Sequence, residues 1–197
     1  MKKALLTIAA LLVTVLSFAK EADEQNPKYG KGAVTTDENG NVCFMETIDI
    51  PQGMNADQCY SILLNWAKGR FAIPYAHDGR ILNEDAQARR FIFHVEQTIV
   101  FKRTALVADE SKISYNFSVS VKDGNAVLKM TDINYRYEEG REGGGLKFSA
   151  EEWITDKEAY NRSGTKFLKS TGKFRVKTID LKEQLFQKAT DAVNGDI

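Results

Sequence analysis

Alternating hydrophobic and polar residues predict several β-strands in the middle of the chain. The clearest stretch is "ISYNFSVSV", residues 113–121, whose odd-numbered side chains are all apolar. The intervening side chains are small and polar, namely Ser114, Asn116, Ser118 and Ser120. Residues 91–101, "FIFHVEQTIVF", alternate in the same way, with His94 and Thr98 on the more polar side. One-sided patterns of this kind are typical of an antiparallel sheet with one buried face and one polar face.

Further strands are predicted on both sides of this pair. Residues 42–50, "VCFMETIDI", alternate up to the turn residues Pro51 and Gly53, and "RILNE" at 80–84 is a short edge strand. Asp123-Gly124 is a strong hairpin turn, and it predicts that residues 126–137 return as the next strand. The alternation of that strand changes phase near Thr131-Asp132, which predicts a β-bulge.

Two long amphipathic helices are predicted by apolar residues at three- and four-residue spacing. The first starts after Asn55, with Gln58 in a variant capping box. Its apolar stripe consists of Cys59, Ile62, Leu63 and Trp66. The second helix starts at an Asp180 cap and ends before Gly195. Its stripe consists of Leu181, Leu185, Phe186, Ala189, Ala192 and Val193.

The expected fold class is therefore α+β, with the element order strand, helix, four strands, an irregular insertion and a terminal helix. The simplest arrangement is an antiparallel sheet with both long helices packed on its apolar face. We expect a single domain over residues 42–197 with the insertion at about 138–178. Within the insertion, Ser149 and Glu152 form a capping box that predicts a short helix with Trp153 facing inward.

The first residues have the pattern of a targeting signal. "MKK" is a basic start, "ALLTIAALLVTVL" is an apolar run too short to span a bilayer, and Ser17 and Ala19 fit a small-residue cleavage site. We expect a signal peptide at residues 1–19, cleaved after Ala19, and a periplasmic or secreted protein. Residues 20–41 are polar and glycine-containing, and we expect a flexible lead-in outside the core. No later segment is apolar enough for a membrane helix.

Charge argues against nucleic acid as a partner. Cleavage removes Lys2 and Lys3 from 27 basic residues that stand against 27 acidic ones, which leaves a net charge of about −2. Nucleic-acid binding needs concentrated positive charge. A cationic run lies at residues 166–177, and such a run is usually a solvated face. Its members are Lys166, Lys169, Lys173, Arg175 and Lys177.

Several of these stretches resemble a known family of secreted bacterial proteins, a domain of unknown function with a TATA-box-binding-protein-like (TBP-like) fold. The similarity is carried by "IDIPQGMNADQCYSILLNWAKGRF", by the turn region "SVKDGNAVLKMTDINY", and loosely by the last helix. Tyr60 and Trp66 on the first helix and the "VKDG" hairpin match the family pattern. The resemblance implies a TBP-like sheet with helices on one side. It implies no activity, no catalytic residue and no DNA binding, because fold does not fix function.

The two cysteines and two histidines are the remaining candidates for chemistry. Cys59 shares its helix stripe with core residues, where a thiol is inert, so the sequence disfavours a nucleophile. Cys43 and Cys59 could form a disulfide in an oxidising compartment, but Cys43 is out of phase with its apolar neighbours, and we favour two free thiols. With His77 and His94 they lack the short ligand spacings of a zinc site. His77, in "AHDG", is expected to serve a turn.

The candidate site is a surface instead. We expect His94, Thr98, Ser114, Asn116, Ser118 and Ser120 to lie on the helix-free face of the sheet as a polar platform for a protein or small ligand of the cell envelope. No catalytic residue, cofactor or metal is assigned, so we expect a binding module and not an enzyme. The alternative is a thiol- or metal-dependent hydrolase that uses Cys59 with His77 or His94.

Overall fold

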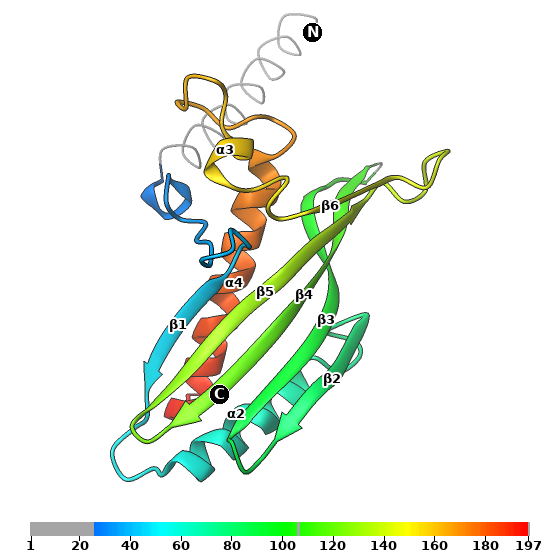
Figure 1. Cartoon of the computed structure of the whole chain (residues 1–197). Helices are drawn as coiled ribbons and strands as arrows, with labels where there is room; N and C mark the ends of the chain where they lie inside the picture. The colour runs from blue at the N-terminus through cyan, green and yellow to red at the C-terminus, as the bar shows by residue number, and fades with distance from the viewer. Residues whose placement is uncertain (1–25, 106, 197) are drawn as a thin grey trace, which may run out of the picture.

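A six-stranded antiparallel sheet forms the body of the molecule (Figure 1). The computed structural model describes residues 26–105 and 107–196. Along the sheet the strands follow the order β1-β5-β4-β3-β2, and β6 pairs with β5. The strands are β1 (Phe44–Asp49), β2 (Asp78–Asp85), β3 (Arg90–Arg103), β4 (Ala108–Lys122), β5 (Asn125–Tyr137) and β6 (Leu146–Ser149). The helical segments are η1 (Pro27–Tyr29), α2 (Ala56–Arg70), α3 (Asp156–Ala159) and α4 (Gly172–Asn194).

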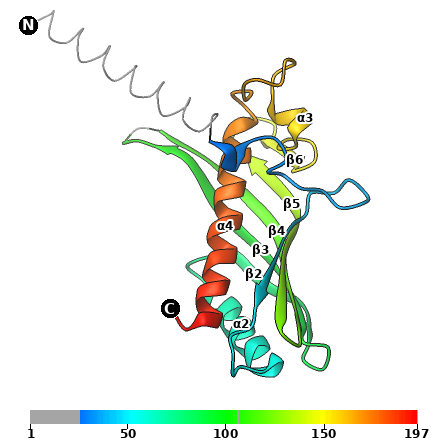
Figure 2. The ribbon, with the colours of Figure 1, turned by 90° about the vertical axis from the view of Figure 1, so that its left-hand side faces the viewer.

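Both long helices lie on the same side of this sheet. Figure 2 shows α2 and α4 on one face, while the opposite face carries neither. The buried side chains of β3 and β4 alternate strictly with half-exposed ones, as the sequence pattern predicts. The expected α+β class, with two long helices packed on one face of an antiparallel sheet, is confirmed.

Helix α2 begins as its sequence predicts. Asn55 accepts a hydrogen bond from the Gln58 backbone and the Gln58 side chain accepts one from Asn55, so the capping box is complete. Cys59 and Leu63 are fully buried, whereas Ile62 and Trp66 at the side of the stripe are half-buried. The buried stripe is therefore rotated slightly towards Tyr60, Leu64 and Ala67.

Helix α4 is about two turns longer than predicted, because it begins at Gly172 and not at Asp180. The cationic run was expected to be solvated, and this is wrong for Arg175, which is fully buried. Its guanidinium donates to the carbonyl oxygens of Tyr29 (2.9 Å) and Ile154 (2.8 Å) and forms an ion pair with Asp156 (2.7 Å). Lys173 is half-buried against Asp109.

The predicted lead-in is also wrong for the part that the structure describes, residues 26–41. Tyr29 and Val34 are buried in the core. The Tyr29 hydroxyl donates to Asp180 on α4 at 2.7 Å, and the Gly32 backbone donates to Asp156. The segment packs because partners from α3 and α4, far away in sequence, satisfy its polar groups. The predicted signal peptide, residues 1–19, lies outside the described residues.

The insertion contains more regular structure than predicted. β6 pairs with the end of β5 along the same edge as β1, so the two strands share successive halves of β5. Ser149 and Glu152 exchange the predicted capping hydrogen bonds, but the residues that follow form turns, and the short helix α3 starts only at Asp156. Trp153 is half-buried and stacks on Phe148. In the described part of the chain, no helix is long and apolar enough to cross a bilayer.

Candidate functional site: the open face of the sheet

The structure places the six predicted surface residues together on the face opposite the long helices, here called the open face. His94 and Thr98 on β3 pair with Asn116 and Lys112 on β4, and Ser114, Ser118 and Ser120 continue the same face of β4. All six are half-exposed between fully buried neighbours. The strict two-residue alternation of β3 and β4 produces this placement, because successive side chains of a strand point to opposite faces.

A hydrogen-bonded chain crosses three strands at the centre of the open face. His94 donates from Nδ1 to the Asn116 side-chain oxygen at 3.1 Å, and the Asn116 amide donates to Asp132 on β5 at 2.7 Å. Because an amide oxygen can only accept, His94 carries a hydrogen on Nδ1 in this arrangement. Asn116 and His94 are thus held in one orientation.

Asp132 occupies its place because of the bulge that the phase change predicted. The ladder between β4 and β5 shifts register between Ser114 and Asn116, and Asp132 has φ +52°. This left-handed conformation is uncommon for residues other than glycine, and asparagine and aspartate tolerate it best. The bulge therefore turns a carboxylate towards the Asn116 amide.

A second set of polar side chains lies on the open face, closer to the Arg103 end of β3. The His77 ring nitrogen Nε2 is 2.7 Å from the Thr98 hydroxyl, so His77 does more than serve a turn. Arg136 on β5 forms an ion pair with Glu96 on β3. The two histidines of the chain therefore both contact side chains of the open face.

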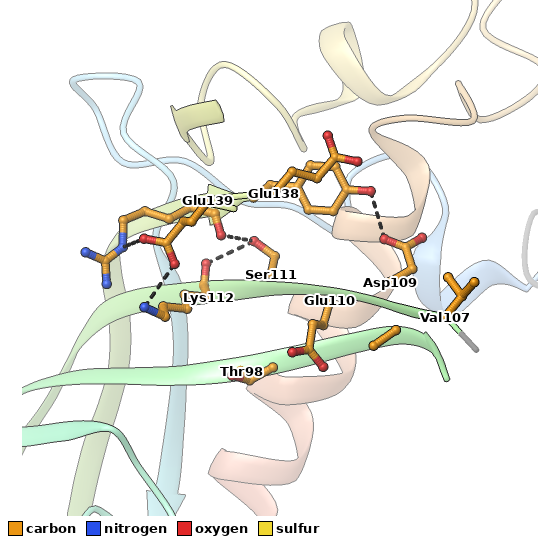
Figure 3. Close-up of a pocket in the computed structure, with 11 residues that line it drawn as sticks. Thr98, Val107, Asp109, Glu110, Ser111, Lys112, Glu138 and Glu139 are labelled. Carbon is orange, nitrogen blue, oxygen red and sulfur yellow. Dashed lines mark hydrogen bonds and ion pairs between the residues drawn. The ribbon is translucent and has the colours of Figure 1, made fainter. Parts of the chain in front are cut away.

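The open face ends in a cleft of about 540 Å³, where β4 and β5 separate (Figure 3). The last pair of the ladder is Ser111 with Tyr137. Beyond it, β3 is the one described strand that pairs with residues 108–110 of β4. Glu139 pairs with Lys112 at 2.9 Å and with Arg136 at 3.5 Å. The cleft is lined by Thr98, Val107, Ala108, Asp109, Glu110, Ser111, Lys112, Arg136, Tyr137, Glu138 and Glu139.

One wall of the cleft is fastened to α4. Lys173 donates to both carboxylate oxygens of Asp109, at 2.9 and 2.8 Å, and to the Tyr137 hydroxyl at 2.8 Å. Burial alone would raise the pKa of Asp109, but the hydrogen bonds from Lys173 and Tyr137 hold it below its usual value. Burial raises the pKa of Tyr137. Asp109 is therefore ionised and Tyr137 neutral at neutral pH.

The cysteines take no part in either site. Both thiols are free, which was the favoured alternative, and Cys43 is half-buried. Cys59 is fully buried on the side of α2 that faces the core, and burial raises the pKa of its thiol to about 11. A nucleophile needs an accessible thiolate, and Cys59 lies on the helix side of the sheet whereas His94 is on the open face. Within residues 26–105 and 107–196, no three His, Cys, Asp or Glu side chains are placed to hold a metal ion.

Sequence reasoning missed the charged members of the open face and the cleft. Glu96 stands in the alternating pattern of β3 and could have been included with His94 and Thr98. Asp132 was marked by the phase change of β5. Apart from Thr98, the cleft residues had no local signal, because they come from strand ends that separate only in three dimensions.

Comparison with known proteins agrees with this architecture. The model of the "Domain of unknown function (DUF4468) with TBP-like fold" matches residues 44–136. A crystal structure of a DUF4468 family protein from Bacteroides ovatus ATCC 8483 is similar at 32% identity and a TM-score of 0.77, over 86% of this chain and 95% of that one. A TBP-like protein from Parabacteroides distasonis ATCC 8503 shares the fold, with a TM-score of 0.65 and 19% identity over 81% of this chain and 96% of that one. No curated protein matches the sequence. The chain therefore belongs to the bacterial DUF4468 family of unknown function, with a TBP-like fold, and the resemblance stated from the sequence is confirmed.

Proposed function

We propose that the protein is a non-catalytic binding module that recognises a protein partner through the centre of the open face. The observation that carries this proposal is the chain from Asp132 through Asn116 to His94. It fixes hydrogen-bonding groups in one orientation on a half-exposed surface. Side chains that are already ordered in the free protein lose less conformational entropy when a partner binds.

The shape of the open face favours a macromolecule over a small ligand. Small ligands bind in concave sites, and the cleft lies at the end of this face and not at its centre. The outward side chains in the middle of β4 are three serines and an asparagine. These short side chains leave a flat surface that can donate and accept hydrogen bonds. The outward side chains of β3 and β4 include no Phe, Tyr or Trp, and His94 is their one aromatic ring, so the open face lacks a row of rings on which successive bases or sugars could stack.

Catalysis is not part of this proposal. Cys59 is inaccessible, and the hydrogen bonds of His94 and His77 go to an amide and a threonine hydroxyl. A catalytic thiol needs a base within hydrogen-bond reach, and no hydrogen bond joins Cys59 to His77 or His94. The thiol hydrolase alternative therefore finds no support in the geometry.

The test is site-specific photo-crosslinking in a bacterium that carries the protein. A photoreactive residue at Lys129, which pairs with Ser118 across β4 and β5, reports what touches the open face. We expect a discrete adduct that disappears with Ser118→Arg, because a bulky cation then stands in the central row. Ser61→Arg is the matched control, since Ser61 is exposed on α2 on the other side of the sheet.

The proposal fails if no specific adduct forms at Lys129, or if Ser118→Arg and Ser61→Arg leave the adduct equally strong. Circular dichroism of Ser118→Arg must match the parent, so that a lost adduct reports binding and not unfolding.

We further propose that binding takes place in the cell envelope or outside the cell. The basic start, the short apolar run and the cleavage pattern ending at Ala19 support this location. The intact mass of the protein purified from fractionated cells is the measurement: a chain that begins at Lys20 and is absent from the cytoplasm is expected, and a full-length cytoplasmic chain contradicts it.

A further inference from the structure

A second surface lies at the β2 edge of the sheet, where large apolar side chains are exposed to an unusual degree. Ile73 is 82% exposed and Tyr75 68% exposed in the connection between α2 and β2. Leu82 is 51% exposed and Ile81 40% exposed on β2 itself. These four residues are called here the edge patch. They serve neither the core nor the open-face proposal.

The connection that carries Ile73 and Tyr75 folds back against the start of β2. A Cβ on Gly79 would lie 2.0 Å from the Phe71 carbonyl oxygen, so the end of α2 and the start of β2 are in direct contact. The His77 backbone donates to Glu96 on β3, which fastens the loop to the sheet. Ile81 and Leu82 follow Gly79 by only two and three residues, on the order of 7–10 Å along the strand. Figure 1 shows this connection beside the start of β2.

Such a patch needs a partner. Soluble monomers scatter exposed apolar residues singly, and apolar side chains that gather on one surface mark an interaction site. β2 is an edge strand, paired with β3 alone among the described strands. However, its ladder shifts register between Ile81 and Asn83, and a bulged edge strand is protected against the addition of another strand. Docking therefore uses side chains and not continuation of the sheet.

The rim of the edge patch identifies the partner. Lys68 pairs with Glu84 at 3.2 Å and Arg80 pairs with Asp78, so the rim carries both signs of charge in adjacent pairs. A bilayer with anionic lipids attracts a surface with an excess of positive charge, and the paired charges of this rim provide no such excess. A surface that presents both signs can face its own copy after a two-fold rotation, with acidic groups opposite basic ones.

We propose that the edge patch is a self-association interface, at which two copies of the chain form a two-fold symmetric dimer. Ile73, Tyr75 and Leu82 form its apolar centre, and the two ion pairs form its rim. An aromatic residue surrounded by aliphatic ones is a typical interface centre. The Arg80–Asp78 pair lies across from His94 and Glu96 of β3, so the rim borders the open face, while the central row of β4 stays free.

The experiment is sedimentation velocity of the purified protein from about 1 µM to about 300 µM, a range suited to an interface of modest area. We expect a concentration-dependent monomer–dimer equilibrium. The double variant Ile73→Ser with Tyr75→Ser, and the single variant Leu82→Ser, should each weaken the dimer at least about tenfold, because each removes apolar area from the same patch. All three positions are exposed, so the fold is retained. Met45→Ser is the control, since Met45 is 62% exposed on β1 and should leave the equilibrium unchanged.

A parent protein that stays monomeric over this range overturns the proposal. So does a double variant that dimerises like the parent, or a control that weakens the dimer as much as the variants do. Co-sedimentation with vesicles of phosphatidylethanolamine and phosphatidylglycerol is the further measurement. Vesicle binding by a monomeric parent that the double variant loses would assign the edge patch to membranes and would also overturn dimerisation.

Discussion

The contact between Asp109 and Lys173 shows how one side chain joins distant elements. Asp109 starts β4, Lys173 starts α4, and the Tyr137 hydroxyl at the end of β5 donates to the same carboxylate at 2.8 Å. The Lys173 ammonium also lies 4.4 Å from the ring centres of Phe101 and Tyr137. A cation over two aromatic faces and beside a carboxylate is stabilised both by the ring quadrupoles and by the opposite charge.

Asp109→Asn should therefore destabilise the protein in a pH-dependent way. The folded-state pKa of Asp109 is below its unfolded value, so its contribution is complete above the unfolded pKa and is lost as pH falls through the folded pKa. We expect a loss of about 1–2 kcal/mol in the free energy of unfolding at neutral pH. The difference from the parent should be constant above about pH 5 and shrink below about pH 4.

Urea denaturation of both proteins between pH 2.5 and pH 7 is the measurement. Glu142→Gln, which neutralises an exposed carboxylate in the loop after β5, is the control and should show little difference at any pH. A destabilisation by Asp109→Asn that does not change with pH would show that packing, and not charge, is what the substitution removes.

At the scale of elements, the strands were predictable and the start of α4 was not. Apolar and polar residues alternate over residues 113–121, and this alternation alone predicts which side chains face the core. The bulge of β5 was predictable for the same reason, because the period shifts at Thr131-Asp132. The first two turns of α4 contain Lys173, Arg175 and Lys177, which indicate a solvated segment until their partners are known. Two of those partners, Asp109 and the Tyr29 carbonyl, are more than sixty residues away, and Ile154 and Asp156 belong to the irregular insertion.

Arg175→Met should release the segment at residues 27–34 from α4. Methionine keeps much of the buried volume but cannot donate to the carbonyl oxygens of Tyr29, Gly30 and Ile154, and it leaves Asp156 without its ion pair. The Asp156 side chain is 40% exposed and stays solvated, so the main cost is the loss of donors to the buried carbonyl oxygens, about 1–3 kcal/mol. We expect a loss of stability of that order and faster amide hydrogen exchange in residues 27–34.

Hydrogen exchange resolved by mass spectrometry, together with urea denaturation, tests this. Lys177→Met on the same helix is the matched control, because Lys177 is only half-buried. Equal exchange at residues 27–34 in the two variants would mean that Tyr29 and Val34 hold the segment by packing alone.

At the scale of the whole molecule, the open face was predictable while the cleft and the edge patch were not. Alternation along β3 and β4 identifies the polar side of the sheet without any tertiary information. The cleft depends on β4 and β5 separating after Ser111 and Tyr137, and the edge patch depends on a contact between Phe71 and Gly79. Both features depend on tertiary packing between helices and strands, and the local periodicity of the sequence contains no information about that packing.

The burial of Cys59 makes its thiol a probe of global opening. Cys59 lies between α2 and the sheet with no exposed surface, and α2 contacts both β4 and α4. A reagent can reach it only when α2 leaves the sheet, which removes a layer of the core. In a Cys43→Ser background we expect native alkylation at least about a thousandfold slower than in the unfolded chain.

The time course of intact mass under native and denaturing conditions measures both rates. In increasing urea the native rate should rise in parallel with the unfolded fraction, because the same opening exposes the thiol. The parent protein should gain two labels in denaturant without reductant, since both thiols are free. Rapid labelling of Cys59 in a protein with native circular dichroism would instead show that α2 detaches locally. The apolar side of the sheet would then be accessible without global unfolding, and partner binding could no longer be assigned to the open face alone.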